Sequence, residues 1–328
     1  MYKVLVVDPI HEKGIECLKK ETDVIVGDID TDIKNFFNQN IGGANGIIVR
    51  GTPVNKELME KAKDLKVIAV HGSGYNNIDV VYATKKNIPV LNTPGISTEA
   101  VTEHILGLIL ALTKRIAYAD RRLRAGKVYS KYEHMNYIGI EIFQRKLGII
   151  GLGKIGLEVA RKCIKAFHMK VLGYYPNIMS EEKRRIVNEL GIDIFQNLHE
   201  MLKQIDVLSI NVPLTDKTRN MISTEELKLM KPSAYLINTA RGAVVDEKAL
   251  INALKSNHIA GAGLDVFVQE PPSAKNPLLS LENVCVTPHI AIGTEETLTK
   301  TALTLCTQVL KVLHGERPDY IVNPEVLN

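Results

Sequence analysis

The stretch Leu147-Gly148-Ile149-Ile150-Gly151-Leu152-Gly153-Lys154-Ile155-Gly156 lies near the middle of the chain. Its apolar first half is typical of a buried strand, and its glycines form a G-x-G-x-x-G turn that a helical pattern at 157–167 follows. Gly151 permits a tight turn, Gly153 lets the backbone approach a pyrophosphate, and Gly156 permits close helix–strand packing. The stretch therefore predicts a dinucleotide site at a helix N-terminus in an α/β fold.

Short apolar runs alternate with amphipathic ones on both sides of this stretch, which predicts two doubly wound parallel sheets. The run 98–124 is expected to be one long helix leaving the first domain, and 295–313 a helix that packs back on that domain. We therefore expect a discontinuous domain of residues 1–100 and 291–328, a dinucleotide-binding domain of residues 101–290, and an active cleft between them. The expected strands are 4–7, 24–26, 47–49, 67–70, 90–91, 148–150, 170–173, 207–210, 234–237, 261–264 and 284–286.

Composition limits the function classes. The 328 residues carry a formal net charge of +4 without a dense basic run, which argues against a nucleic-acid surface. No apolar stretch approaches the ~18 residues of a membrane span, and the N-terminus lacks the apolar run of a signal peptide. The four cysteines form no CxxC pair, so we expect no metal site and a cytoplasmic protein with reduced thiols.

The coenzyme is expected to be NAD, with NADP not excluded. The acidic residue that usually holds the adenosine ribose should end the strand after the glycine turn. Tyr175 occupies that place, and its hydroxyl can hydrogen-bond a ribose but does not repel a 2′-phosphate as a carboxylate would. No arginine stands at 176–178, and Lys183–Arg185 is more typical of a solvated helix face.

Three polar residues follow strand ends further along the chain: Arg241, Glu270 and His289. Ligands of doubly wound sheets bind at the carboxyl ends of the strands. A guanidinium there suits a carboxylate, so Arg241 would hold the substrate and polarise its 2-oxo group. His289 would donate the proton while hydride arrives from a nicotinamide, and Glu270 would pair with His289 to keep it protonated. Asp265 is a candidate contact for the nicotinamide.

The motifs together resemble the D-isomer-specific 2-hydroxyacid dehydrogenases over nearly the whole chain, in the manner of phosphoglycerate dehydrogenases and glyoxylate/hydroxypyruvate reductases. The resemblance rests on the segments 148–156, 230–246, 264–271 and 287–291. It implies a flavodoxin-like substrate domain, a Rossmann-type NAD(P)-binding domain and a homodimer. It also implies cofactor contacts from Lys154, Ile155, Val212, Pro213, Thr239, Ala240 and Thr102, and substrate contacts from Gly72, Ser73, Gly74 and Arg241.

The substrate stays open at this stage. Arg50 is placed to meet a substrate phosphate, but Val70 and His71 supply no second arginine, so 3-phosphoglycerate, glycerate or glyoxylate, and D-lactate-like acids are all compatible. Two other functions remain: an NADH-sensing binding protein of the same fold without catalysis, and a dehydrogenase of the formate or phosphite type. Turnover of a 2-oxo acid with NAD(P)H would separate both from the favoured reading.

Overall fold

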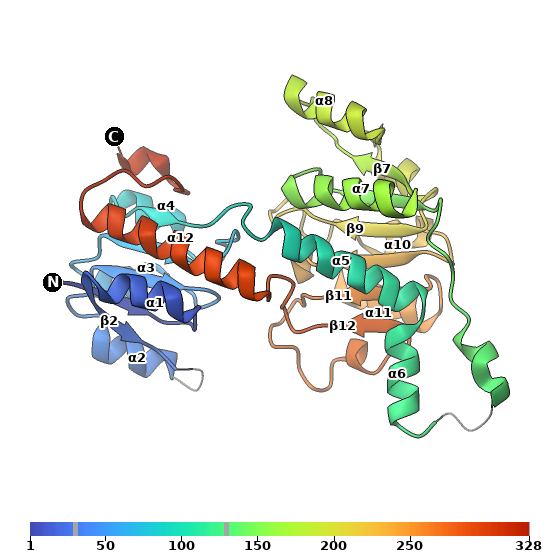
Figure 1. Cartoon of the computed structure of the whole chain (residues 1–328), viewed down its shortest axis with the longest axis horizontal. Coiled ribbons are helices and arrows are strands. Elements are labelled where there is room, and N and C mark those ends of the chain that lie inside the picture. The colour runs from blue at the N-terminus through green and yellow to red at the C-terminus, as the bar shows by residue number, and fades with distance from the viewer. Residues whose placement is uncertain (29–31, 128–130, 328) are drawn as a thin grey trace. The chain divides into compact units, whose positions relative to one another are not determined.

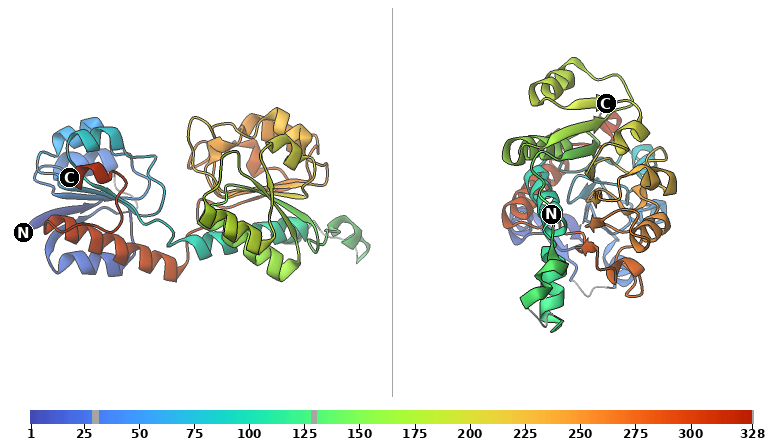
Figure 2. Two further views of the ribbon diagram at one scale, coloured as in Figure 1. Left: turned by 90° about the horizontal axis from the view of Figure 1, so that it is seen from above. Right: turned by 90° about the vertical axis from the view of Figure 1, so that its right-hand side faces the viewer.

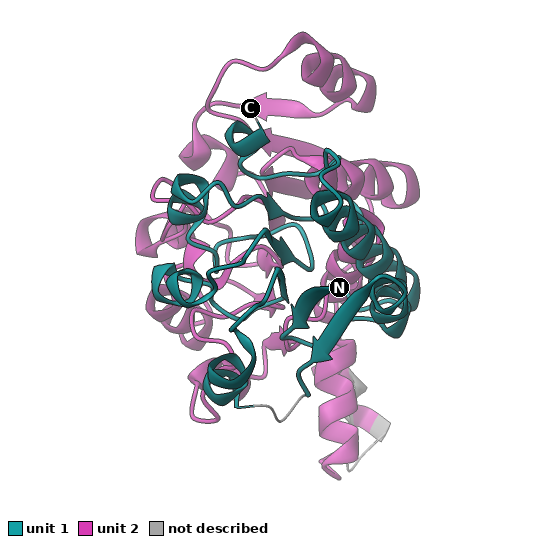
Figure 3. Ribbon diagram, turned by 90° about the vertical axis from the view of Figure 1, so that its left-hand side faces the viewer, with its two compact units in different colours: residues 1–97, 292–328 teal, residues 98–291 magenta. Residues whose placement is uncertain are grey.

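The computed structural model describes residues 1–28, 32–127 and 131–327. It divides the chain into two compact units, coloured in Figure 3. Unit 1 comprises Met1–Ser97 and Ile292–Asn328, and unit 2 comprises Thr98–Ala291. Each unit is an α/β fold around one sheet whose named strands all pair in parallel, so the predicted fold class is confirmed.

Unit 1 contains a five-stranded sheet of order β2-β1-β3-β4-β5, the flavodoxin-like order. The strands alternate with helices along the chain, and α12 returns from the far end of the sequence to the same unit (Figure 1). The elements are β1 (Tyr2–Val6), α1 (Glu12–Lys19), β2 (Thr22–Val26), α2 (Ile33–Asn40), β3 (Gly46–Val49), α3 (Lys56–Lys61), β4 (Val67–Val70), α4 (Val80–Lys85), β5 (Val90–Leu91), α12 (Glu295–Leu313) and the short 3₁₀ helix Pro324–Leu327.

The alternation of side chains along β1 explains the two layers of helices in unit 1. Val4 and Val6 pack with Leu18 of α1 and Leu305 of α12 on one face of the sheet. Leu5 and its neighbours on the other strands pack with residues of α2, α3 and α4 on the opposite face. Because helices cover both faces of the sheet, its strands are nearly continuous apolar runs. This property allowed them to be predicted from the sequence.

Unit 2 contains a seven-stranded sheet of order β12-β11-β10-β9-β6-β7-β8. Its chain order reverses between β6 and β9, which is the topological switch point of a Rossmann sheet. The elements are α5 (Thr98–Thr113), α6 (Ile116–Arg124), a 3₁₀ helix (Lys131–Tyr137), β6 (Lys146–Ile150), α7 (Lys154–Phe167), β7 (Lys170–Tyr174), α8 (Glu181–Leu190), β8 (Asp193–Phe195), α9 (Leu198–Leu202), β9 (Val207–Ile210), α10 (Thr224–Leu229), β10 (Tyr235–Asn238), a 3₁₀ helix (Gly242–Val244), α11 (Glu247–Lys255), β11 (Gly261–Leu264), a 3₁₀ helix (Pro277–Leu279) and β12 (Val284–Val286).

Helices also cover both faces of this second sheet, as Figure 2 shows from two further directions. One core joins the strands to α9, α10 and α11 through residues such as Met201, Leu227 and Leu250. On the other face α5 lies against β10 and β11, and α7 packs beside α5. Gly263 permits the close approach of α5, because a Cβ there would meet Leu108 at 3.1 Å and Leu112 at 3.2 Å.

The prediction of one long helix over 98–124 is wrong. The structure has two helices, α5 and α6, separated at Lys114 and Arg115, where Arg115 adopts a left-handed φ of 55°. The carbonyl of Thr113 accepts the N–H of Ile140 at 2.8 Å, so a distant segment occupies an acceptor that the helix would have needed. In the described part of the chain, no helix combines the length and the apolar character needed to span a bilayer.

Candidate functional site

The glycine turn between β6 and α7 has the geometry that close approach of a dinucleotide requires. Gly151 has a φ of +97°, and a Cβ there would lie 2.6 Å from the carbonyl oxygen of Asn211. A Cβ at Gly156 would collide with the Gly151 carbonyl. Gly153 differs, because a Cβ there would meet nothing within 4 Å. Its missing side chain therefore leaves open space at the loop rather than permitting internal packing.

The backbone N–H groups at the N-terminus of α7 lie next to the open space at Gly153. Gly153 is the N-cap and supplies no side-chain cap, and the first turn holds no acidic residue. The N–H groups of the first turn of a helix lack partners within the helix and carry a partial positive charge. Residues Lys154, Ile155 and Gly156 form this turn, so their backbone fits a pyrophosphate.

Two glycine substitutions should separate folding from cofactor binding. Gly151→Ala forces a Cβ into the Asn211 carbonyl at a left-handed φ, and we expect a loss of stability of about 1–3 kcal/mol. Gly153→Ala has room and an ordinary φ of −84°, so its melting temperature should stay near that of the wild type. Its NADH affinity should nevertheless fall about tenfold or more, since the methyl group keeps the phosphates from the helix end. Thermal melts and NADH titrations measure both, and unchanged affinity in Gly153→Ala would contradict the loop assignment.

The other predicted cofactor residues of unit 2 follow strand ends or face the sheet. Val212 and Pro213 follow β9, and the Val212 side chain would lie 2.8 Å from a Cβ at Gly151. Thr239 and Ala240 follow β10. Thr102 of α5 is fully buried, and its hydroxyl has no hydrogen-bond partner among the described residues. The positions of Val212, Pro213, Thr239 and Ala240 after the carboxyl ends of strands fit a dinucleotide. The Thr102 hydroxyl has no accessible surface at which a ligand could meet it.

The turn after β10 presents Arg241. Buried Asn238 holds this turn, since its amide donates to the Arg241 carbonyl and accepts the Ala240 N–H, both at 3.0 Å. A Cβ at Gly242 would collide with the backbone of Phe267, so the glycine lets the arginine turn pack against the segment that leads to Glu270. Burial lowers the pKa of Arg241, and the charge of Glu270 opposes that shift. Sequence reasoning missed Asn238, although its position at a strand end was a usable signal.

Glu270 and His289 form a direct pair. Oε2 of Glu270 lies 2.6 Å from Nδ1 of His289, and 46% of the His289 side chain is exposed. Burial disfavours ionisation of Glu270, but hydrogen bonds from His289 and the Phe267 N–H, with the charges of His289 and Arg241, hold the pKa of Glu270 below its ordinary value. The carboxylate is therefore ionised near neutral pH. The structure thus brings together all three residues predicted to carry the chemistry.

Asp265 holds the segment that carries His289. It is fully buried, and its carboxylate accepts the N–H groups of Ile290 and Ala291, both at 2.9 Å, and the hydroxyl of Thr287 at 2.6 Å. Its carbonyl accepts the His289 N–H at 2.8 Å. These bonds stabilise His289 at a φ of 54°, which is uncommon for a residue with a side chain. His104 of α5, which sequence reasoning missed, bonds Thr287 at 2.9 Å.

The substrate-binding candidates Arg50, Gly72, Ser73 and Gly74 belong to unit 1 and follow β3 and β4. Asp8, also missed from the sequence, accepts the N–H of Arg50 at 2.6 Å and thereby holds the loop that begins there. Gly72 has a φ of +136°, and its carbonyl accepts the Thr93 N–H at 2.9 Å. Buried His71 precedes this loop, and burial with the charge of Arg50 lowers its pKa to about 4, so it is neutral.

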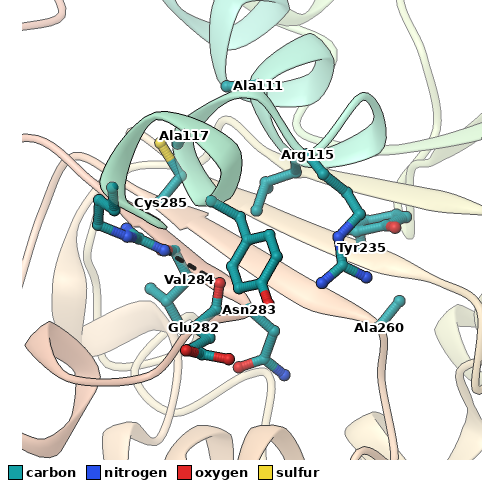
Figure 4. A pocket seen from close by; sticks show the side chains of 12 residues that line it. Ala111, Arg115, Ala117, Tyr235, Ala260, Glu282, Asn283, Val284 and Cys285 are labelled. Carbon is teal, nitrogen blue, oxygen red and sulfur yellow. Dashed lines mark hydrogen bonds between the residues drawn. The ribbon is translucent and has the colours of Figure 1, made fainter. Parts of the chain in front are cut away.

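A cavity of about 60 Å³ lies elsewhere in unit 2 (Figure 4). Tyr235 begins β10, Ala260 precedes β11 and Asn283 precedes β12, so this cavity lies at the amino ends of the strands. Arg241 and His289 follow the carboxyl ends of β10 and β12, and neither lines this cavity among the residues that the structure describes. The cavity is therefore distinct from the candidate catalytic residues. In the described part of the chain, no group of three or more His, Cys, Asp or Glu is suited to a metal ion.

Comparison with known proteins agrees with this geometry. The family model "D-isomer specific 2-hydroxyacid dehydrogenase, NAD binding domain" matches residues 106–291, more than half of the chain. The chain belongs to the D-isomer specific 2-hydroxyacid dehydrogenase family. It is accordingly an NAD(P)-dependent oxidoreductase, which confirms the resemblance, the enzyme class and the cofactor class predicted from sequence.

Individual members of the family show the extent of the similarity. The chain is 41% identical over 324 residues to a D-3-phosphoglycerate dehydrogenase of Methanocaldococcus jannaschii, covering 98% of this chain but only 60% of that relative. It is 38% identical over 327 residues to a glyoxylate reductase of Korarchaeum cryptofilum, covering 99% and 97% of the two chains. A crystal structure of the NADPH-dependent glyoxylate/hydroxypyruvate reductase of Sinorhizobium meliloti with NADP and malonate gives a TM-score of 0.82 at 28% identity, covering 98% and 96%.

Proposed function

We propose that this dehydrogenase reversibly reduces a small 2-oxo acid to a D-2-hydroxy acid, with Arg241, Glu270 and His289 as its catalytic residues. The observation that carries the proposal is the 2.6 Å pair between Glu270 and His289, which stands beside the Arg241 turn in the unit that holds the glycine loop. A cation for a carboxylate, a proton donor with its anionic partner and a dinucleotide loop are the parts that hydride transfer to a 2-oxo acid needs.

In the proposed reaction, the two nitrogens of His289 have different roles. Nδ1 faces Glu270, so Nε2 is the atom that meets the substrate oxygen. Bound NAD(P)H supplies the hydride to C2 of the 2-oxo acid. His289 donates the proton from Nε2 to the carbonyl oxygen, and in the oxidation direction the neutral imidazole accepts it from the hydroxyl. Arg241 binds the carboxylate, and we propose that the loop at Gly72, Ser73 and Gly74 adds backbone N–H groups to that carboxylate.

Glu270→Gln should narrow the pH range of reduction. Because the pKa of Glu270 is lowered, its carboxylate stays ionised from neutral pH to below the pH at which a glutamate ordinarily titrates. It therefore stabilises the imidazolium form of His289 over that whole range and stops doing so only when the pH falls through the lowered pKa. The amide removes this charge at every pH. We expect kcat for reduction at neutral pH to fall about 10- to 100-fold, with the alkaline limb of the kcat/KM profile displaced to lower pH. A profile that keeps its wild-type limbs would remove Glu270 from this role.

Glyoxylate and hydroxypyruvate are the substrates that we place first. The K. cryptofilum relative, which matches along 97% of its own length, is named a glyoxylate reductase. The S. meliloti structure is named for both glyoxylate and hydroxypyruvate. Loss of absorbance at 340 nm with NADH and NADPH tests them beside pyruvate, branched and aromatic 2-oxo acids and 3-phosphohydroxypyruvate. Oxidation of formate or phosphite in place of any 2-oxo acid, or cofactor binding without turnover, would contradict the proposal.

The proposal includes a homodimer built through unit 2. Large apolar side chains that are more than half exposed concentrate on α6 and the segment after it, and such a concentration is typical of a covered surface. Leu123→Glu should shift the sedimentation coefficient toward that of a monomer, whereas Ile178→Glu, at an 89% exposed position elsewhere in unit 2, should leave it unchanged. A wild-type protein that sediments as a monomer would contradict the dimer. The exposed apolar side chains on α6 and the segment after it are Ile116, Leu123, Tyr132, Met135, Ile138 and Phe143.

A further inference from the structure

Tyr175 stands where the sheet of unit 2 meets the adenosine half of a dinucleotide. It directly follows β7, the strand beside β6, and its N–H bonds the carbonyl of Phe195 in β8 at 3.0 Å. In sheets of this order, the residue at this strand end contacts the adenosine ribose, and a carboxylate there selects NAD by repelling a 2′-phosphate. Tyr175 is half-buried and uncharged, so this repulsion is missing at its position.

A cation lies over the ring of Tyr175. Nζ of Lys183 is 4.9 Å from the ring centroid, and Lys183 belongs to the first turn of α8, which lies beside β7 in Figure 1. The sequence favoured a solvated helix face for this residue, and the structure instead brings it to the strand end. Arg185 on the same helix is paired with Glu189 at 2.9 Å. Among residues 1–28, 32–127 and 131–327, no carboxylate forms an ion pair with Lys183.

The chemistry of these two side chains matches a phosphate monoester on a ribose. A lysine ammonium binds phosphate as a compact point charge, and a tyrosine hydroxyl donates a hydrogen bond to the ribose or to a phosphate oxygen. The aromatic ring also restrains the flexible lysine before the ligand arrives, which lowers the entropy lost on binding. Glu181 and Glu182 lie in the same first turn of α8 and offset the positive end of its helix dipole, so Lys183 is the cation of this site.

We propose that Tyr175 and Lys183 form a binding site for the 2′-phosphate of NADPH, so that this protein binds NADPH at least as tightly as NADH. Lys183 is thereby a specificity-determining residue on a helix outside the glycine loop. The inference deepens the proposed function by naming its coenzyme, and it rests on the dinucleotide site of unit 2, not on the identity of the 2-oxo acid.

Direct titration of both coenzymes tests the site without any turnover. Dissociation constants for NADPH and NADH are measured by nucleotide fluorescence with the wild type, Lys183→Ala and Arg184→Ala. Arg184 is the matched control, because it is the next residue of the same helix, is exposed and carries the same charge. We expect Lys183→Ala to lower the affinity for NADPH about 10- to 100-fold, which is the scale of one charge-assisted hydrogen bond. The affinity for NADH should change less than about twofold. Arg184→Ala should change neither coenzyme by more than about twofold.

A second variant reverses the preference. Tyr175→Asp should lower the affinity for NADPH about tenfold or more relative to the wild type, because a carboxylate repels the 2′-phosphate. Its affinity for NADH should stay the same or improve, because the carboxylate accepts a hydrogen bond from the 2′-hydroxyl. NADPH affinity in the wild type should also fall more steeply with salt than NADH affinity, because one more ionic contact is screened. Thermal melts establish that each variant is folded.

Three results would overturn the proposal: tighter binding of NADH than of NADPH by the wild type, an equal loss of affinity for both coenzymes in Lys183→Ala, or a loss of NADPH affinity in Arg184→Ala equal to that in Lys183→Ala. The proposed function fails in a different way. Absence of turnover on every 2-oxo acid, with NADPH still bound through Lys183, would reject the reaction and leave this site standing.

Discussion

His289→Gln is expected to lose about 10²- to 10⁴-fold in kcat for 2-oxo acid reduction, the range that a positioned general acid contributes. Glutamine retains a polar side chain of similar reach but cannot donate a proton and take up another at neutral pH. NADH affinity should change little, because the glycine loop and α7 that hold the coenzyme are separate from His289 in the sequence and the sheet. Steady-state kinetics and a coenzyme titration on the same preparation measure both.

The chain supplies a close control for this variant. His199 of α9 pairs with Glu226 at 2.8 Å, and 48% of its side chain is exposed, so it resembles His289 in partner and environment. It lies outside the candidate site, and His199→Gln should keep wild-type kcat. Near-normal turnover in His289→Gln, or an equal loss in both variants, would remove His289 from the role of proton donor.

Arg241→Ala should lower kcat/KM for the 2-oxo acid about 10²- to 10³-fold, since it removes one partner of a desolvated charge pair. The loss should appear in both KM and kcat, because the guanidinium binds the carboxylate and also polarises the carbonyl that accepts hydride. Arg241→Lys keeps the charge without the planar fork, so it should recover only part of the loss. Kinetics across a substrate series and coenzyme titration distinguish these effects.

Arg219 is the matched control for Arg241, because it is an exposed arginine of the same unit. Arg219→Ala should leave KM and kcat for the 2-oxo acid unchanged. Truncation of Arg241 also removes a positive charge beside Glu270, so the pKa of Glu270 should rise toward its ordinary value in Arg241→Ala. Unchanged kinetic constants in Arg241→Ala would show that another cation binds the carboxylate.

Most strands and the three catalytic candidates could be predicted because their signals are local. Buried parallel strands appear as apolar runs, and the polar residue that follows such a run must lie at the carboxyl edge of the sheet. Arg241 and His289 were predicted in this way, and α12 was predicted with its observed bounds. The short strand β8 was missed because Asp193–Phe195 is an edge strand of three residues with two exposed side chains, so it shows no apolar run.

The order of residues along the chain thus determined the two parallel sheets, the glycine turn and the types of residue at the strand ends. Only the tertiary structure decided which distant groups meet: Ile140 at the carbonyl that ends α5, the backbone of 290–291 on buried Asp265, and Lys183 over Tyr175. Each of these contacts joins segments whose separation in sequence carries no periodic signal. The reason is physical, since hydrophobic periodicity records which side of an element is buried, whereas a hydrogen bond or a charge contact depends on where two elements come to lie after packing.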